Sequence, residues 1–124
     1  MQPRIKKLLF VSLILVIIGI TVLSLLPPRS APDMHTNDKV GHFIAYAVLS
    51  LNFGLWINQI KAHAKYLVLL ISYGALMEFL QGFVPGRDQS FLDMLANASG
   101  VIIGFGINYI VQFFRTKKGD KNPI

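Results

Sequence analysis

The stretch of residues 8–26 contains no charged side chain, and this constrains the fold more than any other feature of the chain. A helix rises about 1.5 Å per residue, so a helix of this length crosses the hydrocarbon core of a membrane, which is about 30 Å thick. Three further apolar stretches follow at 40–57, 66–84 and 91–114. Backbone polar groups in lipid must be satisfied within the segment, which requires helices. The predicted fold is therefore all-α, an integral membrane bundle of four transmembrane helices.

Composition supports this class, because 53% of the 124 residues are hydrophobic and only 15% are charged. A soluble domain of this size is less apolar. No internal repeat or low-complexity linker divides the chain, so residues 1–124 are expected to form a single membrane domain. The absence of cysteine excludes disulfides, cysteine-based zinc sites and thiol catalysis.

A signal peptide is the competing interpretation of the first stretch, because Arg4, Lys6 and Lys7 precede it. The apolar run is longer than the core of a signal peptide, which has about 7 to 15 residues. The sequence Leu25-Leu26-Pro27-Pro28 also lacks the small residues of a cleavage site. A retained helix is therefore favoured, and Pro27-Pro28 is expected to end it.

Basic residues set the expected orientation, because Lys and Arg are retained on the cytoplasmic side of short loops. Nine of the twelve fall on one side of the four spans: Arg4, Lys6, Lys7, Lys61, Lys65, Arg115, Lys117, Lys118 and Lys121. Only Arg29, Lys39 and Arg87 fall on the other. Both termini are therefore predicted to be cytoplasmic, in a bacterial inner membrane. The basic tail, 115–124, is expected to contact anionic lipid, and no motif for nucleic-acid binding accompanies the charge.

This topology brings polar side chains together at the outer membrane face. The candidate site residues are Asp38, Lys39, His42, Tyr46, Glu78, Gln81, Arg87, Asp93 and Asn97. Residues three or four apart share one face of a helix, so those of the second, third and fourth spans can point inward together. Arg87 lies in the short loop between the third and fourth spans.

Several of these residues also have a structural interpretation. Asp38 and Asp93 suit helix caps, and Ser90 followed by Asp93 resembles a capping box. Asn97 suits an interhelical hydrogen bond, and the pair Gly100 and Gly104 suits close helix packing. These alternatives stay open at the level of sequence.

Glu78 and His42 favour function more strongly. An unpaired carboxylate in hydrocarbon costs several kcal/mol, so Glu78 must pair with Arg87, be protonated or face a wet cavity. His42 is the natural proton carrier near neutral pH, although a structural histidine is an equal alternative.

The motifs resemble the VanZ-like family. They are Asp38-Lys39 with Gly41-His42, Glu78-x-x-Gln81, Arg87, and Asp93-x-x-x-Asn97-x-x-Gly100, within a motif region of 38–104. This family of small bacterial membrane proteins is named for resistance to the glycopeptide teicoplanin. The resemblance implies a polytopic protein of the cell envelope that contributes to such resistance.

Two classes of function remain open. In a membrane enzyme, Glu78 or Asp93 would act as general base and His42 as proton shuttle. Arg87 and Lys39 would hold an anionic group, with Gln81, Asn97, Asp38 and Tyr46 completing the binding site. The substrate would be a lipid-linked or amphiphilic envelope molecule.

In the second class the same residues recognise a lipid headgroup or lipoglycopeptide without chemistry. Proton or ion transport is a weaker alternative, because few polar residues continue inward from Glu78. Asp38, His42, Glu78 and Asp93 could hold a divalent cation, but their spacing does not identify a metal site, and no cofactor is predicted. The sequence does not identify a protein partner.

Overall fold

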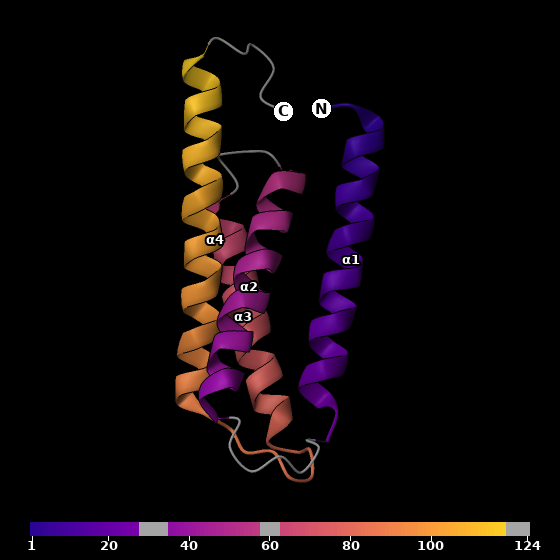
Figure 1. Ribbon diagram of the computed structural model, residues 1–124, viewed down its shortest axis with the longest axis vertical. Coiled ribbons are helices and arrows are strands. Elements are labelled where there is room, and N and C mark those ends of the chain that lie inside the picture. The colour runs from indigo at the N-terminus through magenta and orange to yellow at the C-terminus, as the bar shows by residue number, and fades with distance from the viewer. Residues whose placement is uncertain (28–34, 58–62, 119–124) are drawn as a thin grey trace.

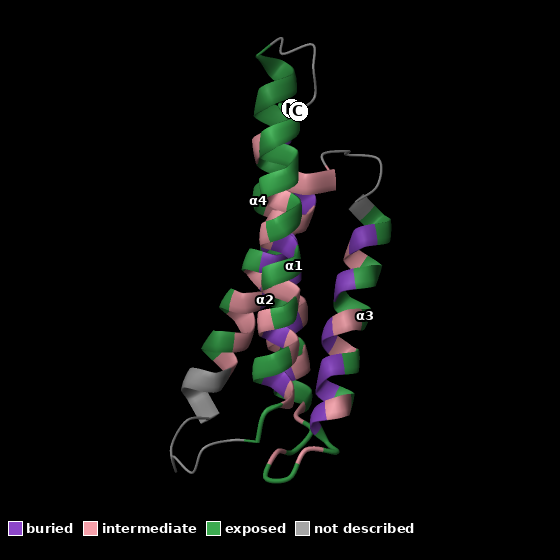
Figure 2. Cartoon of the chain, turned by 90° about the vertical axis from the view of Figure 1, so that its right-hand side faces the viewer, coloured by how far each residue is buried: buried purple, intermediate pink, exposed green. Residues whose placement is uncertain are grey.

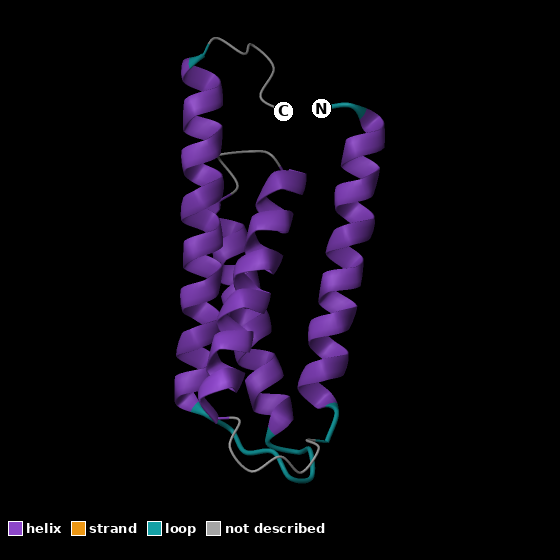
Figure 3. Cartoon of the chain, viewed as in Figure 1, coloured by secondary structure: helices purple, strands orange, loops and turns teal. Residues whose placement is uncertain are grey.

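The computed structural model describes residues 1–27, 35–57 and 63–118, without the side chains of 35–38 and 63. These ranges contain four α-helices and no strand (Figure 3). The helices are α1 Pro3–Leu25, α2 His35–Ile57, α3 His63–Gln81 and α4 Phe91–Lys117. The all-α prediction is confirmed, and each helix coincides with one of the apolar stretches.

The helices alternate in direction, so α2 and α4 run parallel to each other. The first residue of α1 and the last residue of α4 lie at the same end of the bundle, and the segment 82–90 lies at the opposite end (Figure 1). The sequence explains two of the turns. Leu26 is extended, as expected for a residue before proline, and α1 stops at Leu25. Gly86 has φ 81°, a conformation that favours glycine, in the turn after α3.

Two glycines allow α4 to pack closely against α2. A Cβ atom at Gly100 would meet the carbonyl oxygen of Phe43, and one at Gly104 would lie 2.6 Å from the carbonyl oxygen of Ala47. The missing side chains therefore let the two helix backbones approach, as small residues do between membrane helices. Ser50 adds a hydrogen bond of 2.7 Å to the Val101 carbonyl across the same interface. The predicted role of the glycine pair is confirmed.

Polar contacts fasten α1 to its neighbours. The Asn52 amide donates to the Ser12 hydroxyl at 2.6 Å, and the hydroxyls of Thr21 and Tyr73 are 2.8 Å apart. The opposite side of α1 is apolar and exposed, with Leu8 and Leu23 each 68% exposed. One side of α1 is buried in the apolar core through Leu13 and Ile20, and the hydrogen bonds fix the orientation of the helix there.

Apolar side chains cover much of the outside of the bundle, and many polar side chains lie inside it. The buried residues of α3 lie on the side that faces the other helices (Figure 2). The buried polar side chains are Ser24, Ser50, Glu78, Gln81, Asp93, Asn97, Asn108 and Gln112. A water-soluble helical bundle normally shows the reverse distribution.

Three helices of the described part are long and apolar enough to cross a membrane: α1, the Lys39–Ile57 portion of α2, and α4. The predicted third span, α3, does not meet this criterion. Lys65 near its start and Glu78 near its end make it less apolar, and its 19 residues leave little length to compensate.

Substitution of two glycines on α4 is expected to have opposite effects. Gly104→Ala should destabilise the bundle by about 1–3 kcal/mol, because the new methyl group meets the α2 backbone. Gly106→Ala should be neutral or stabilise by up to about 1 kcal/mol, since nothing lies within 4 Å of its Cβ position and alanine favours the helix. Thermal unfolding in detergent would compare the two, and equal melting temperatures would contradict this packing.

Candidate functional site

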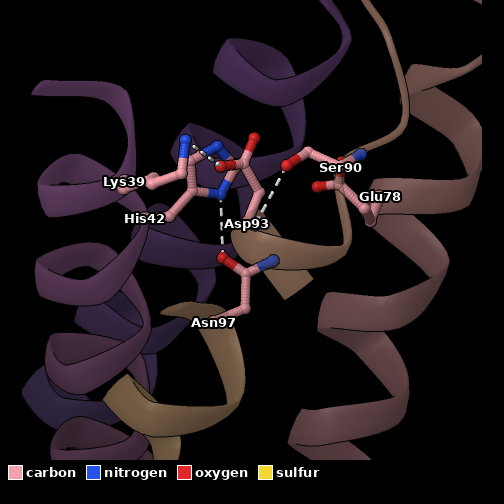
Figure 4. A network of polar contacts seen from close by, with 6 residues as sticks. All are labelled: Lys39, His42, Glu78, Ser90, Asp93 and Asn97. Atoms are coloured by element: carbon pink, nitrogen blue, oxygen red, sulfur yellow. Dashed lines mark hydrogen bonds and ion pairs between the residues drawn. The ribbon is translucent and has the colours of Figure 1, made fainter. Parts of the chain in front are cut away.

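Most of the predicted site residues meet at the end of the bundle opposite the chain termini. Figure 4 shows side chains from α2, α3 and the start of α4 converging there. They are Lys39 and His42 of α2, Glu78 of α3, and Ser90, Asp93 and Asn97 at the start of α4. Asp38 also lies in α2, but its side chain is outside the described residues.

His42 and Asn97 form a hydrogen-bonded pair between α2 and α4. The Nδ1 atom of His42 is 2.8 Å from the Oδ1 atom of Asn97. The amide nitrogen of Asn97 in turn donates to the Gly74 carbonyl of α3 at 3.5 Å. Asn97 is 3% exposed, so it holds the imidazole from within the bundle. Its interhelical hydrogen bonds agree with the structural interpretation, and its contact with His42 places it in the polar cluster.

The start of α4 is capped by its own N-cap residue, Ser90, and by Glu78 of α3. The Ser90 hydroxyl accepts a hydrogen bond from the Asp93 N–H at 3.2 Å, which is half of the expected capping box. The Ser90 N–H donates to Glu78 Oε1 of α3 at 2.6 Å, where a capping box would use the side chain of Asp93. Glu78 therefore supplies the second half of the cap from another helix.

This contact explains how a carboxylate that is 1% exposed is stabilised. A helix N-terminus carries unsatisfied N–H groups and partial positive charge, and both favour an anion. Sequence reasoning offered Arg87 as the partner of Glu78, but the described contacts of Arg87 go elsewhere. The backbone of α4 is the partner found here.

Because Glu78 completes the cap, the Asp93 carboxylate points toward α2. Its Oδ1 atom is 3.7 Å from the Lys39 ammonium group, and it receives no hydrogen bond from the described residues. The Asp93 side chain is 10% exposed and that of Lys39 is 36% exposed. The pair therefore lies where the polar interior reaches the surface.

Gln81 and Arg87 cap the last turn of α1. The Gln81 amide donates to the Ser24 carbonyl at 3.2 Å. Arg87 donates from Nε to the Leu26 carbonyl at 2.7 Å and from Nη2 to the Leu23 carbonyl at 3.1 Å. The last carbonyls of a helix lack partners and carry partial negative charge, so an amide and a guanidinium suit them well. These two candidates hold α1 in place rather than facing His42.

Tyr46 lies one turn deeper in the bundle than His42. Its ring is 6.0 Å from that of Tyr73, and a Cβ atom at Gly74 would lie 3.0 Å from it. The hydroxyl of Tyr46 is buried and has no hydrogen-bond partner among the described residues. The residue forms the floor of the polar cluster.

Sequence reasoning missed a second polar group in the other half of the bundle. Asn108 is fully buried, and Gln112 donates to its Oδ1 atom at 3.3 Å. The Tyr66 hydroxyl lies beside Asn108 and Ser50, joining α2, α3 and α4. Gly104, Asn108 and Gln112 follow one another at intervals of four residues and so share one face of α4. This spacing would have indicated that Asn108 and Gln112 are buried.

The described residues contain no group of three or more His, Cys, Asp or Glu side chains that could hold a metal ion. Asp38, whose side chain is outside the described part, was one of the four candidate ligands. Within the described part, the cluster thus combines one histidine, two carboxylates in separate roles, an amide and an ammonium group.

Comparison with known proteins gives one informative relative, the Uncharacterized protein C11E3.10 of Schizosaccharomyces pombe. It is 30% identical over 116 residues, which cover 91% of this chain and 69% of the relative. The chain belongs to the family of this yeast protein. The similarity extends over most of the four-helix bundle rather than over a single motif. No family model and no solved structure matches the chain.

The cap provided by Glu78 leads to a clear expectation. Glu78→Gln keeps an acceptor oxygen for the Ser90 N–H and should cost about 1 kcal/mol or less. Glu78→Leu removes the acceptor and should cost about 1–3 kcal/mol. Unfolding in detergent would measure both variants. A Gln variant as unstable as the Leu variant would show that the charge, and not the hydrogen bond, stabilises this end.

Proposed function

We propose that this chain is a VanZ-like integral membrane protein with four transmembrane helices and both termini in the cytoplasm. The apolar outer surface and the buried polar residues support insertion. The helix α3 is included because Glu78 and Gln81 near its end are buried and contact the start of α4 and the end of α1. The orientation is supported by the basic residues that the structure describes at the termini end: Arg4, Lys6, Lys7, Lys65, Arg115, Lys117 and Lys118.

Labelling of single cysteines would test this orientation, because the chain has no cysteine of its own. A membrane-impermeant maleimide added to intact cells should modify Asp88→Cys, which lies in the loop after α3. It should modify Lys118→Cys only after the membrane is opened. The reverse pattern would invert the topology, and labelling of both in intact cells would place both ends of the bundle outside.

We further propose that the end containing His42 and Asp93 binds the headgroup of an amphiphilic or lipid-linked molecule of the bacterial cell envelope. The observation that carries this proposal is a polar cluster that reaches the surface of the bundle at Lys39, next to exposed apolar side chains. Exposed Phe91, Leu92 and Leu95 lie on the same turns of α4 as Asp93, so a headgroup and an acyl chain could be held together.

The contacts divide the candidate residues between two tasks. His42, Asp93, Lys39 and Asn97 form the part that would meet a ligand, with Tyr46 beneath them. Glu78, Gln81 and Arg87 hold the ends of α4 and α1. Because the Glu78 carboxylate is engaged by the Ser90 N–H, recognition without chemistry is favoured. Catalysis is the second candidate, supported by the His42–Asn97 pair, with Asp93 as base.

Transport through the bundle has less support. Leu49 and Val101 are fully buried, and their positions along α2 and α4 separate His42 and Asn97 from the deeper group around Asn108. Such an apolar layer opposes a continuous polar path.

The relative in fission yeast favours a lipid headgroup over a glycopeptide as the common ligand of the family. Resistance to teicoplanin would then be a consequence of recognising an amphiphile, and would depend on the same residues.

Expression in a teicoplanin-susceptible bacterium would test the proposal. Wild type should lower sensitivity to teicoplanin, and His42→Gln and Asp93→Asn should abolish the effect at equal membrane levels. Asp88→Asn is the matched control, since it makes the same change at an exposed loop position and should act as wild type. Vancomycin serves as the comparison drug. No protection by wild type, or full protection by Asp93→Asn, would contradict the proposed role.

A further inference from the structure

The surroundings of Asn97 determine how its side-chain amide is oriented. On one side lies the Gly74 carbonyl oxygen, which can only accept a hydrogen bond. On the other lies His42 Nδ1, 2.8 Å away. The amide nitrogen must therefore face Gly74, and the amide oxygen must face the imidazole. The reverse orientation would place two oxygen acceptors against each other.

Gly74 is what brings that carbonyl close to Asn97. A Cβ atom at this position would lie 3.2 Å from the Asn97 Cβ and 3.0 Å from the Tyr46 ring. The α3 backbone therefore approaches α4 at the level of His42. The Asn97 side chain of α4 is held between His42 of α2 and Gly74 of α3. The orientation of the amide is thus built into the packing of the bundle.

An oxygen facing Nδ1 requires that Nδ1 carry a proton. In the neutral ring Nε2 then has no proton and is a hydrogen-bond acceptor. A second acceptor is nearby on α4, because Asp93 Oδ1 receives no hydrogen bond from the described residues. Lys39 adds a cation 3.7 Å from this oxygen.

We infer that Asn97 is a positioning residue that holds His42 in the Nδ1–H tautomer, and that Asp93 Oδ1 beside it accepts a hydrogen bond from a headgroup that carries hydroxyl groups beside an anionic group. A sugar or glycerol phosphate has this chemistry, whereas a headgroup without donors does not. The ligand class rests on the proposed function, but the tautomer of His42 does not.

Solid-state ¹⁵N NMR of the full-length protein in lipid bilayers would test the tautomer without any ligand. Protonated and unprotonated ring nitrogens have distinct shifts, and His42→Gln would identify the signal among the three histidines. In the neutral ring, wild type should be protonated at Nδ1. Protonation at Nε2 in wild type would overturn the inference.

Variants at position 97 make the test specific. Asn97→Asp keeps an oxygen toward Nδ1 and should preserve the Nδ1–H form. Asn97→Leu has similar volume but no acceptor, and should give a mixture that includes the Nε2–H form. Asn108→Leu removes an equally buried amide of α4 and should leave His42 unchanged. An unaltered tautomer in Asn97→Leu would overturn the positioning role, and if that variant does not fold, the wild-type spectrum decides.

The headgroup class is tested by a matched pair of lipids. Phosphatidylglycerol and phosphatidylmethanol have the same phosphodiester charge, but only the first has glycerol hydroxyls. Bilayers containing phosphatidylglycerol should shift the signal of Asp93 Cγ, and the shift should be lost with phosphatidylmethanol. Identical spectra in the two lipids would overturn the hydroxyl-bearing ligand. They would leave the tautomer intact, and the drug-sensitivity experiment separately decides the proposed function.

Discussion

The hydrogen bond from the Ser90 N–H to the Glu78 carboxylate is the interaction on which the polar end of this bundle depends. It joins the last turn of α3 to the first residue before α4, at a point where both a buried anion and a helix N-terminus need a partner. The carboxylate accepts a hydrogen bond from the helix N-terminus, and the N-terminal N–H group gains an acceptor. The Asp93 side chain is thereby released from the helix cap and faces Lys39 of α2.

The end of α3 and the loop after it thus hold two other helices in place. Glu78 binds the start of α4, while Gln81 and Arg87 bind the end of α1. In a bundle whose outer surface is apolar, such bonds supply the directional contacts that burial of apolar area in lipid does not. The helices α2 and α4 are held differently, by the close approach that Gly100 and Gly104 permit. His42 and Asn97 lie along the α2–α4 interface, between the cap at the start of α4 and the close approach at Gly100.

Sequence reasoning found the helices and the convergence of the polar residues, because both follow from local rules. Apolar length predicts helices, and the spacing of His42, Glu78 and Asp93 along three of them places the residues at one end. The pairing of Glu78 was not predictable in the same way. Arg87 was its nearest candidate in the chain, but the turn containing Gly86 carries the guanidinium to α1. Asn108 escaped notice because its neighbours in sequence are apolar.

Three features follow from the amino-acid sequence alone: the chain forms apolar helices, α4 has a pair of glycines suited to close packing, and a set of polar residues gathers near one end. Hydrophobic length and helical periodicity are local properties, so they can be read without coordinates. The pairing of the polar groups, in contrast, follows from the three-dimensional packing of the helices. The partners of Glu78, Arg87 and Asn97 come from other helices, and their choice depends on the rotation and depth of each helix in the bundle.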